Sequence, residues 1–98
     1  MTGSLINQTD EELMVLYQQD DTRAFDFLFR RYSGKVFGFL KNRISDLALA
    51  EDVFQAVFVK LHKSRNQFDS SLKFKAWLFT ICRTVIADAY RQRPKIET

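Results

Sequence analysis

Hydrophobic residues recur at intervals of three and four along most of the chain, which is the spacing that places them on one face of an α-helix. They do not follow the interval of two that is typical of strands. Glycine occurs three times and proline once, so few positions interrupt these runs. The pattern predicts an all-α protein, a compact bundle of about four helices, over about residues 9–19, 21–43, 46–65 and 73–93.

Local signals for helix ends support these bounds. Thr9 followed three residues later by Glu12 is a capping box, in which each side chain can accept a hydrogen bond from the backbone of the other residue. Pro94 ends the last helix because it has no backbone N–H to donate. We therefore expect one helical domain over residues 9–93, preceded by a flexible N-terminus, 1–8, and followed by a tail or the start of a linker, 94–98.

The three longer predicted helices each have one apolar stripe, which we assign to the core. Gly34 and Gly38 lie one turn apart in the second helix, where they either permit close approach of another backbone or weaken the helix. The stripes consist of Phe25, Leu28, Phe29, Tyr32, Val36, Phe39 and Leu40, then Ala50, Val53, Phe54, Val57, Phe58 and Leu61, and finally Phe74, Trp77, Leu78, Ile81, Val85 and Ala89.

The face of the third helix opposite its core stripe holds Asp52, Gln55, Ala56 and Val59. A face that only meets solvent usually carries more charge than this one. A mixture of apolar and polar groups suits contact with the helices of another protein, in which apolar area gives affinity and polar groups set the register. A solvated face is the alternative interpretation.

The outer face of the fourth helix alternates small residues with arginines, and it holds Ala76, Thr80, Arg83, Thr84, Ala87 and Arg91. Small side chains let a phosphate backbone lie close while guanidinium groups and hydroxyls reach its oxygens. Alternatively, the small residues only fill an exposed surface. Lys73 and Lys75 open the helix, so its free backbone amides and the preceding loop are expected to form one anion-attracting corner.

The segment between the third and fourth helices, residues 66–72, has the density of Asn, Asp and Ser that is typical of a turn-rich loop. Its amides and hydroxyls can hydrogen-bond the edge of an unpaired base, which is the natural ligand of a polar loop flanked by basic residues. Phe68 is either a stacking surface for a base or a plug in the core, and we favour the plug.

Charge is distributed unevenly along the chain, although its net value is only +3. Residues 1–59 contain six Lys and Arg against nine Asp and Glu, a net charge of −3, whereas residues 60–98 contain nine against three, a net charge of +6. A basic segment of this density indicates a polyanionic partner, because neutralising phosphates releases condensed counterions. The alternative is a solvated basic face.

Composition and motifs favour a binding protein over an enzyme. With 98 residues, 46% of them hydrophobic, the chain can bury a real core. No phosphate loop, nucleophile elbow or metal-ligand spacing occurs, so we expect no catalytic residue, cofactor or metal. His62 is expected at the surface and Cys82 in the core. One cysteine, the lack of a long apolar run and the lack of a leader indicate a cytoplasmic protein without a membrane segment.

The sequence from about Thr9 to Gln92 resembles region 2 of the extracytoplasmic-function (ECF) group of bacterial RNA polymerase sigma factors. The similarity is specific because its fragments occur in the family's order and spacing. They are Ala24-Phe25, the stretch at Tyr32, Ala50-Glu51-Asp52-Val53-Phe54-Gln55-Ala56-Val57-Phe58, Phe68-Asp69, Phe74-Lys75-Ala76-Trp77-Leu78, Ile81-Cys82-Arg83-Thr84, Asp88 and Arg91.

The resemblance implies the sigma region 2 fold and two partners, RNA polymerase core and partly single-stranded promoter DNA, with an anti-sigma factor as a further candidate partner. It implies that the third helix docks on the clamp helices of the largest polymerase subunit, and that the loop and the fourth helix bind the minus-ten element and open it. The polymerase contacts implied are Glu51, Asp52, Gln55, Ala56 and Val59. The residues and the resemblance together give the candidate DNA contacts, of which Arg65, Lys73 and Lys75 come from the residue pattern alone. They are Arg65, Asn66, Gln67, Asp69, Ser70, Ser71, Lys73, Lys75, Thr80, Arg83, Thr84, Ala87 and Arg91.

Two positions depart from the family's pattern. Members usually carry a carboxylate at the position of Ala56 and Asn at the position of Thr84, and the resemblance does not extend to the family's second, helix-turn-helix domain. We expect the chain to be an excised domain, the alternative being a single-domain variant. A different interpretation is a sigma-like interaction module, a decoy or a partner of an anti-sigma factor, that does not read DNA.

Overall fold

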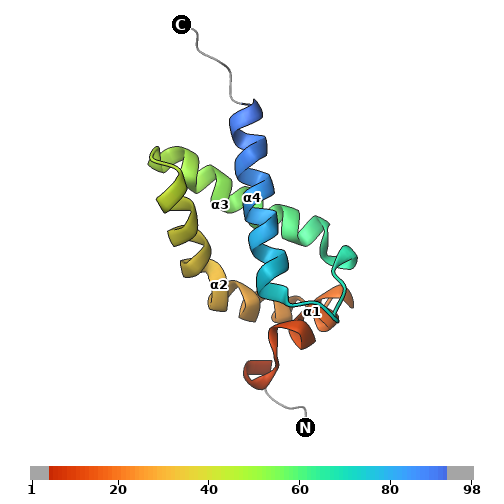
Figure 1. The fold of residues 1–98 in the computed structure, drawn as a ribbon. Coiled ribbons are helices and arrows are strands. Elements are labelled where there is room, and N and C mark those ends of the chain that lie inside the picture. The colour runs from red at the N-terminus through yellow and green to blue at the C-terminus, as the bar shows by residue number, and fades with distance from the viewer. Residues whose placement is uncertain (1–4, 93–98) are drawn as a thin grey trace, which may run out of the picture.

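Four α-helices form the fold in the computed structural model, which describes residues 5–92 (Figure 1). No strand occurs over this range, and the all-α prediction is confirmed. Every predicted helix begins within two residues of an observed one, and the first three also end within two residues of it. The predicted end of the fourth helix, residue 93, lies outside the described residues. The helices are α1 (Asp10–Gln18), α2 (Thr22–Arg43), α3 (Leu47–Lys63) and α4 (Phe74–Gln92), with two short 3-10 helices, η1 (Leu5–Asn7) and η2 (Arg65–Gln67).

Of the two predicted terminal segments, the structure describes only residues 5–8. Residues 1–4 and the predicted tail, 94–98, lie outside the described residues. Within the predicted N-terminal segment, Leu5–Asn7 forms η1, and the Arg31 guanidinium donates a hydrogen bond to the carbonyl oxygen of Ile6 at 3.1 Å. The same guanidinium forms an ion pair with Asp10 at 2.9 Å, so α2 holds the chain just before α1 and at its start.

Side-chain caps define the starts of the first three helices. The capping box predicted at α1 is confirmed: Thr9 N donates to Glu12 Oε1 at 2.9 Å, and Glu12 N donates to Thr9 Oγ1 at 3.0 Å. Asp21 caps α2 and Asp46 caps α3 without the reciprocal bond of a capping box, each side chain accepting a hydrogen bond from a backbone N–H in the first turn. These acceptors satisfy donors that a helix start leaves without an intrahelical partner.

Helix α4 begins in a different way. The backbone N–H of Phe74 donates a hydrogen bond at 2.7 Å to Oε2 of Glu11, a residue of α1 that lies 63 positions earlier. The cap is therefore supplied by another helix. In Figure 1, α1 lies beside the connection that leads into α4, and α4 crosses in front of α3.

One hydrophobic core joins all four helices. Most residues of the predicted stripes are buried, and Cys82 is fully buried as predicted. Phe25, Phe29 and Phe54 are only partly buried, because they lie at the outer edge of the seam between α2 and α3, where their rings pack against one another and against Phe58. The buried residues are Leu13, Met14, Tyr17, Ala24, Leu28, Tyr32, Val36, Leu40, Ile44, Ala50, Val53, Val57, Phe58, Leu61, Phe68, Phe74, Leu78, Ile81, Cys82 and Val85.

Gly34 and Gly38 do not mark a close helix contact in this fold. Both are exposed on α2, and a Cβ atom added at either position would meet nothing within 4 Å. Close approach of another backbone from within residues 5–92 is therefore the wrong explanation for them.

None of the helices in the described part of the chain has the length and apolar character needed to span a bilayer.

Candidate functional site

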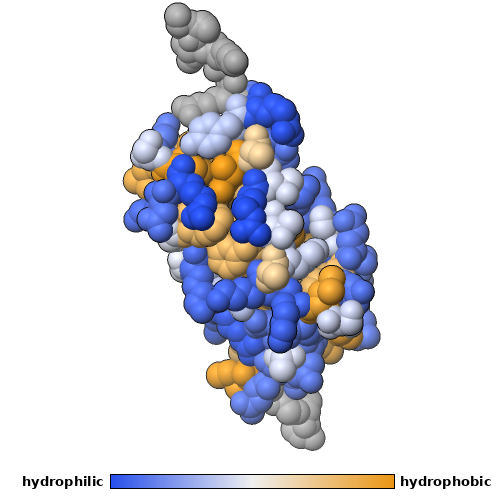
Figure 2. All heavy atoms as spheres, viewed as in Figure 1, coloured by the Kyte–Doolittle hydropathy of each residue, from blue (hydrophilic) through white to orange (hydrophobic). Residues whose placement is uncertain are grey.

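The outer face of α4 is open to solvent along its length. Thr80, Arg83, Thr84, Ala87 and Arg91 are all exposed, so none of them is used to build the core. Along the helix that crosses the front of Figure 1, Figure 2 shows hydrophilic side chains separated by paler, smaller ones. This surface matches the alternation that the sequence predicted for a face that lies against a phosphate backbone.

The polar groups of this face differ in how far they are already engaged. The Arg83 side chain forms no hydrogen bond or ion pair with any described residue, whereas Arg91 pairs with Asp88 on the preceding turn. The Thr80 hydroxyl donates back to the carbonyl oxygen of Ala76 at 3.0 Å, which leaves its oxygen lone pairs for a second partner. Arg83 is thus the cation of this face that is most available to an anion.

The start of α4 is less open to anions than its sequence suggests. Lys73 and Lys75 are exposed, as expected for phosphate contacts. The first backbone amide, at Phe74, is already bonded to the Glu11 carboxylate, which also brings negative charge to the helix start. The predicted anion-attracting corner is therefore partly wrong, because a carboxylate of the protein occupies the position where a phosphate would bind best.

The loop between α3 and α4 is anchored by an aromatic plug. Phe68 is 5% exposed, and its ring centroid lies 5.0 Å from that of Trp77 and 6.1 Å from that of Phe74. The core-plug interpretation is confirmed for the chain as described. A buried ring cannot serve as a stacking surface for a base unless the loop opens.

Only some polar side chains of the loop remain free to bind a ligand. The Asp69 carboxylate accepts from the backbone and the hydroxyl of Ser71, at 2.9 and 2.8 Å, and these bonds lower the pKa of the Asp69 carboxyl. Asn66, Gln67 and Ser70 are exposed and make no hydrogen bond through their side chains to the described residues. The loop therefore presents two amides and one hydroxyl, and the bonds between Asp69 and Ser71 hold the turn around Ser70.

Arg65 is engaged within the fold, although the sequence places it among the candidate DNA contacts. Its guanidinium donates to the carbonyl oxygen of His62 at 2.8 Å and forms an ion pair with Asp20 at 3.0 Å. It also lies over the ring of Tyr17, 5.5 Å from the centroid. The Asp20 carboxylate offsets its charge, so the geometry gives Arg65 a role in holding the loop against α1.

His62 shows a contact that the sequence did not predict. It is exposed, as expected for a surface residue, but its Nδ1 lies 2.5 Å from the hydroxyl oxygen of Tyr17, a residue of α1. Burial raises the pKa of Tyr17, with the nearby Arg65 guanidinium acting in the opposite direction.

No three His, Cys, Asp or Glu residues come together as metal ligands in the part of the chain that the structure describes.

The candidate protein-binding face of α3 is fully exposed. Asp52, Gln55, Ala56 and Val59 are solvent-accessible, and none of them is bonded through its side chain to another described residue. Val59 is 52% exposed, which is high for an aliphatic side chain. Glu51, also exposed, lies beside these residues and lines a separate groove toward α2.

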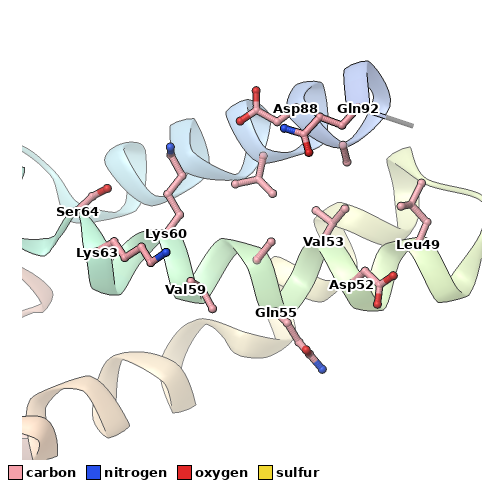
Figure 3. A pocket seen from close by; sticks show the side chains of 13 residues that line it. Leu49, Asp52, Val53, Gln55, Val59, Lys60, Lys63, Ser64, Asp88 and Gln92 are labelled. Atoms are coloured by element: carbon pink, nitrogen blue, oxygen red, sulfur yellow. The ribbon is translucent and has the colours of Figure 1, made fainter. Parts of the chain in front are cut away.

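These α3 residues form one wall of a groove of about 680 Å³ whose other wall is α4. Figure 3 shows Asp52, Gln55 and Val59 on α3, with Asp88 and Gln92 on the facing helix. The sequence analysis missed the α4 wall, because helical periodicity identifies the faces of one helix but does not predict which face of another helix lies beside it. The polar residues of the groove that it missed are Asp88 and Gln92 on the α4 wall and Lys60 and Lys63 near the end of α3.

The chain is similar to known proteins over most of its length. Residues 28–96 match the sequence profile of Sigma-70 region 2. RNA polymerase sigma factor CarQ of Myxococcus xanthus is 36% identical over 74 residues, which is 76% of this chain and 42% of that protein. The ECF RNA polymerase sigma-E factor of Haemophilus influenzae is 37% identical over 73 residues, 74% of this chain and 38% of that protein. The chain thus spans about two fifths of the length of these relatives.

A solved structure has the same arrangement of helices. It is an NMR structure of an engineered region 2 of sigmaE in complex with GTAAAA, and it matches with a TM-score of 0.74 and 27% sequence identity. The match covers 96% of this chain and 100% of that chain. The fold around both candidate faces is therefore shared with a protein that was solved in complex with that sequence.

Proposed function

Because the chain belongs to the Sigma-70 region 2 family and is an ECF-type member of it, we propose that it recognises and melts the promoter minus-ten element while bound to RNA polymerase core. The observation that carries this proposal is that the α3–α4 loop and the outer face of α4 both expose side chains that the fold does not use. They offer Arg83, which forms no hydrogen bond or ion pair with a described residue, and the free amides of Asn66 and Gln67, which suit the edge of an unpaired base. Such a protein acts as a binding module in the cytoplasm and uses no covalent chemistry.

The DNA contact divides into two parts with different chemistry. Arg83, Thr84 and Ala87 form a surface on which a phosphate backbone can lie close to the helix, which gives affinity without reading sequence. Asn66 and Gln67 supply amide donors and acceptors suited to the edge of an unpaired base, which gives sequence preference. Capture of an unpaired base favours the opened strand over the duplex, and this difference in affinity drives melting.

The polymerase contact is assigned to the α3 wall of the groove described above. An exposed Val59 beside Ala56 offers apolar area, and Asp52 and Gln55 offer the polar groups that set the register of a helical partner. We propose that the clamp helices of the largest polymerase subunit bind here. Ala56 replaces a carboxylate that is usual in the family, so the electrostatic part of this contact is expected to be weaker.

The domain of residues 9–93 accounts for one part of promoter recognition. The relatives are more than twice as long as the matched segment, so we propose that binding of the minus-thirty-five element belongs to a separate helix-turn-helix domain. The 98-residue chain is then expected to show preference among single strands on its own, and weak binding to intact duplex. An anti-sigma factor that covers the α3 face would compete with polymerase.

Selection from a random pool tests the proposal directly. Fluorescent single-stranded DNA hexanucleotides of random sequence, with GTAAAA included as a reference, are bound to the wild-type chain, and the retained strands are sequenced. We expect one sequence family to be enriched, and fluorescence anisotropy to give at least a tenfold higher affinity for it than for the same bases in scrambled order. Equal affinities would contradict base reading and favour the interaction-module interpretation.

A further inference from the structure

Helix α1 contacts both ends of the connection between α3 and α4. Gln18 Nε2 donates hydrogen bonds to the carbonyl oxygens of Arg65 and Phe68, at 2.8 and 2.9 Å. Glu11 Oε2 accepts one from the N–H of Phe74 at 2.7 Å. The two α1 residues are seven positions apart, which is about two helical turns, so they lie on the same face. We call Glu11 and Gln18 together the α1 brace.

The Gln18 amide restrains the shape of the loop backbone. Its two N–H groups bind carbonyl groups three residues apart, at the beginning of η2 and immediately after its end. Phe68 N donates to the same Arg65 carbonyl only at 3.4 Å, so the loop's own bond at this point is long. Much of the restraint on this turn therefore comes from a side chain of α1.

Further contacts around Arg65 reinforce this restraint. Its guanidinium lies over the ring of Tyr17, which precedes Gln18 in α1, and is paired with Asp20, which lies two positions after Gln18. Asn66 and Gln67, whose side chains are exposed, are the two residues between Arg65 and Phe68 in the sequence, and Gln18 binds the carbonyl groups of both of these flanking residues. Fixing the carbonyls thus fixes the backbone from which the candidate base-reading amides project.

We propose that the α1 brace positions the α3–α4 loop for reading an unpaired base, with Gln18 as the main positioning residue; this rests on the proposed function. Ordering a loop before binding removes an entropic cost that would otherwise oppose capture of the base. The Glu11 carboxylate at the start of α4 disfavours a phosphate there, so this end of the loop is suited to reading bases. None of the predicted DNA contacts lies in α1, and its contribution is indirect.

The test compares Gln18→Met with Gln19→Met in the whole 98-residue chain. Methionine has about the length of glutamine but no N–H donor, and Gln19 is an exposed neighbour without a side-chain hydrogen bond to the described residues. The probes are the hexanucleotide that the wild-type chain enriches and its scrambled form. We expect Gln18→Met to weaken binding of the enriched strand about five- to tenfold, the effect of removing one net hydrogen bond or slightly more, with less than about a twofold change for the scrambled strand. Gln19→Met should behave as wild type.

Amide hydrogen exchange supplies a readout that does not depend on DNA. In Gln18→Met the amides of residues 66–71 should exchange about five- to tenfold faster than in wild type, while the core amides of α2 and α3 keep their protection. Glu11→Ala should speed exchange at Phe74, and Glu11→Gln, which keeps an acceptor oxygen, should restore most of the protection.

Three outcomes would overturn the positioning role of the brace. Gln18→Met could keep the wild-type preference for the enriched strand, or its loop amides could exchange as in wild type. It could also lose affinity for both strands equally together with a lower unfolding temperature, which would indicate a purely structural effect. A wild-type chain that enriches no hexanucleotide would refute the proposed function itself, and base positioning with it. That failure is recognised before any variant is measured.

Discussion

The ring of Phe68 in the α3–α4 loop lies 5.0 Å from the ring of Trp77 in α4, and this contact ties the candidate base-reading loop to the hydrophobic core. Phe68 is nearly fully buried, and Trp77 covers it from the first turn of α4. Loop conformation and helix packing are therefore coupled. A change that loosens this ring contact should affect stability and DNA binding together.

Phe68→Ala is expected to lower the free energy of unfolding by about 3–5 kcal/mol, because it removes a buried ring and leaves a cavity beside Trp77. Phe68→Leu fills much of that space and should cost less, about 1–2 kcal/mol. Urea unfolding followed by Trp77 fluorescence measures both values. If the ring were a stacking surface for a base, Phe68→Leu would abolish single-strand binding while leaving stability nearly unchanged, and the plug assignment would be wrong.

Arg83→Glu should weaken single-stranded DNA binding more than Arg91→Glu, because Arg83 has no side-chain partner among the described residues whereas Arg91 already pairs with Asp88. We expect the double reversal to reduce affinity at least about tenfold. The double reversal should also lower the slope of log K against log salt concentration by about 0.7 for each phosphate of the single strand that the variant no longer binds. Anisotropy titrations at several salt concentrations give both quantities.

Arg30→Glu is the matched control for these reversals. Arg30 is an exposed arginine of α2 that likewise forms no ion pair with the described residues, so its reversal changes the net charge by the same amount away from the α4 face. Its effect should be small and non-specific. Equal losses of affinity from Arg30→Glu and Arg83→Glu would argue for general electrostatic attraction without a defined DNA-binding face.

Asp52→Ala is expected to weaken binding to RNA polymerase core about fivefold or more and to leave single-strand affinity unchanged, because Asp52 is on the α3 wall, away from the loop. Ala56→Glu should act in the opposite direction, since it introduces the carboxylate that family members usually carry there. Competition against a labelled sigma factor for purified core enzyme measures both effects. Loss of DNA binding by Asp52→Ala would show that the two faces are not independent.

Cys82 is expected to be unreactive in the folded protein. It is fully buried, and burial raises the pKa of its thiol to about 11. At pH 8 only about one thiol in a thousand would then be ionised, and access is blocked as well. Alkylation by iodoacetamide, followed by mass spectrometry, should require prior unfolding with denaturant. Rapid labelling of the native chain would contradict the burial of Cys82.

The raised pKa of Cys82 also predicts a direction for stability against pH. The pKa of the folded thiol lies above its ordinary value of 9.0, so the folded state favours the neutral form. The corresponding stabilisation is fully present below about pH 9 and is lost as the pH rises toward 11. Cys82→Ala should show a smaller loss of stability over this interval than wild type in urea unfolding.

Local sequence determined the helices and the starts of the first three of them. Capping by Thr9 and Glu12 involves residues three positions apart, and each apolar stripe lies within one helix. Residues close together in the sequence are therefore enough to predict where these helices lie. For the same reason the burial of Cys82 and the exposure of Arg83 could be predicted from their positions on α4. The resemblance to a known family added the partners, which periodicity alone could not supply.

Tertiary structure alone decided how residues far apart in the chain share their hydrogen bonds. The sequence suggested Arg65 as a DNA contact, whereas in the structure Arg65 forms an ion pair with Asp20, which lies 45 positions earlier. Glu11 caps a helix 63 positions later, and Gln18 holds the loop from 47 and 50 positions away. The sequence around a donor or acceptor does not predict its distant partner, because the two meet only when the helices pack. The sequence therefore indicated which faces are candidates for binding, and the fold determined which side chains on them remain free.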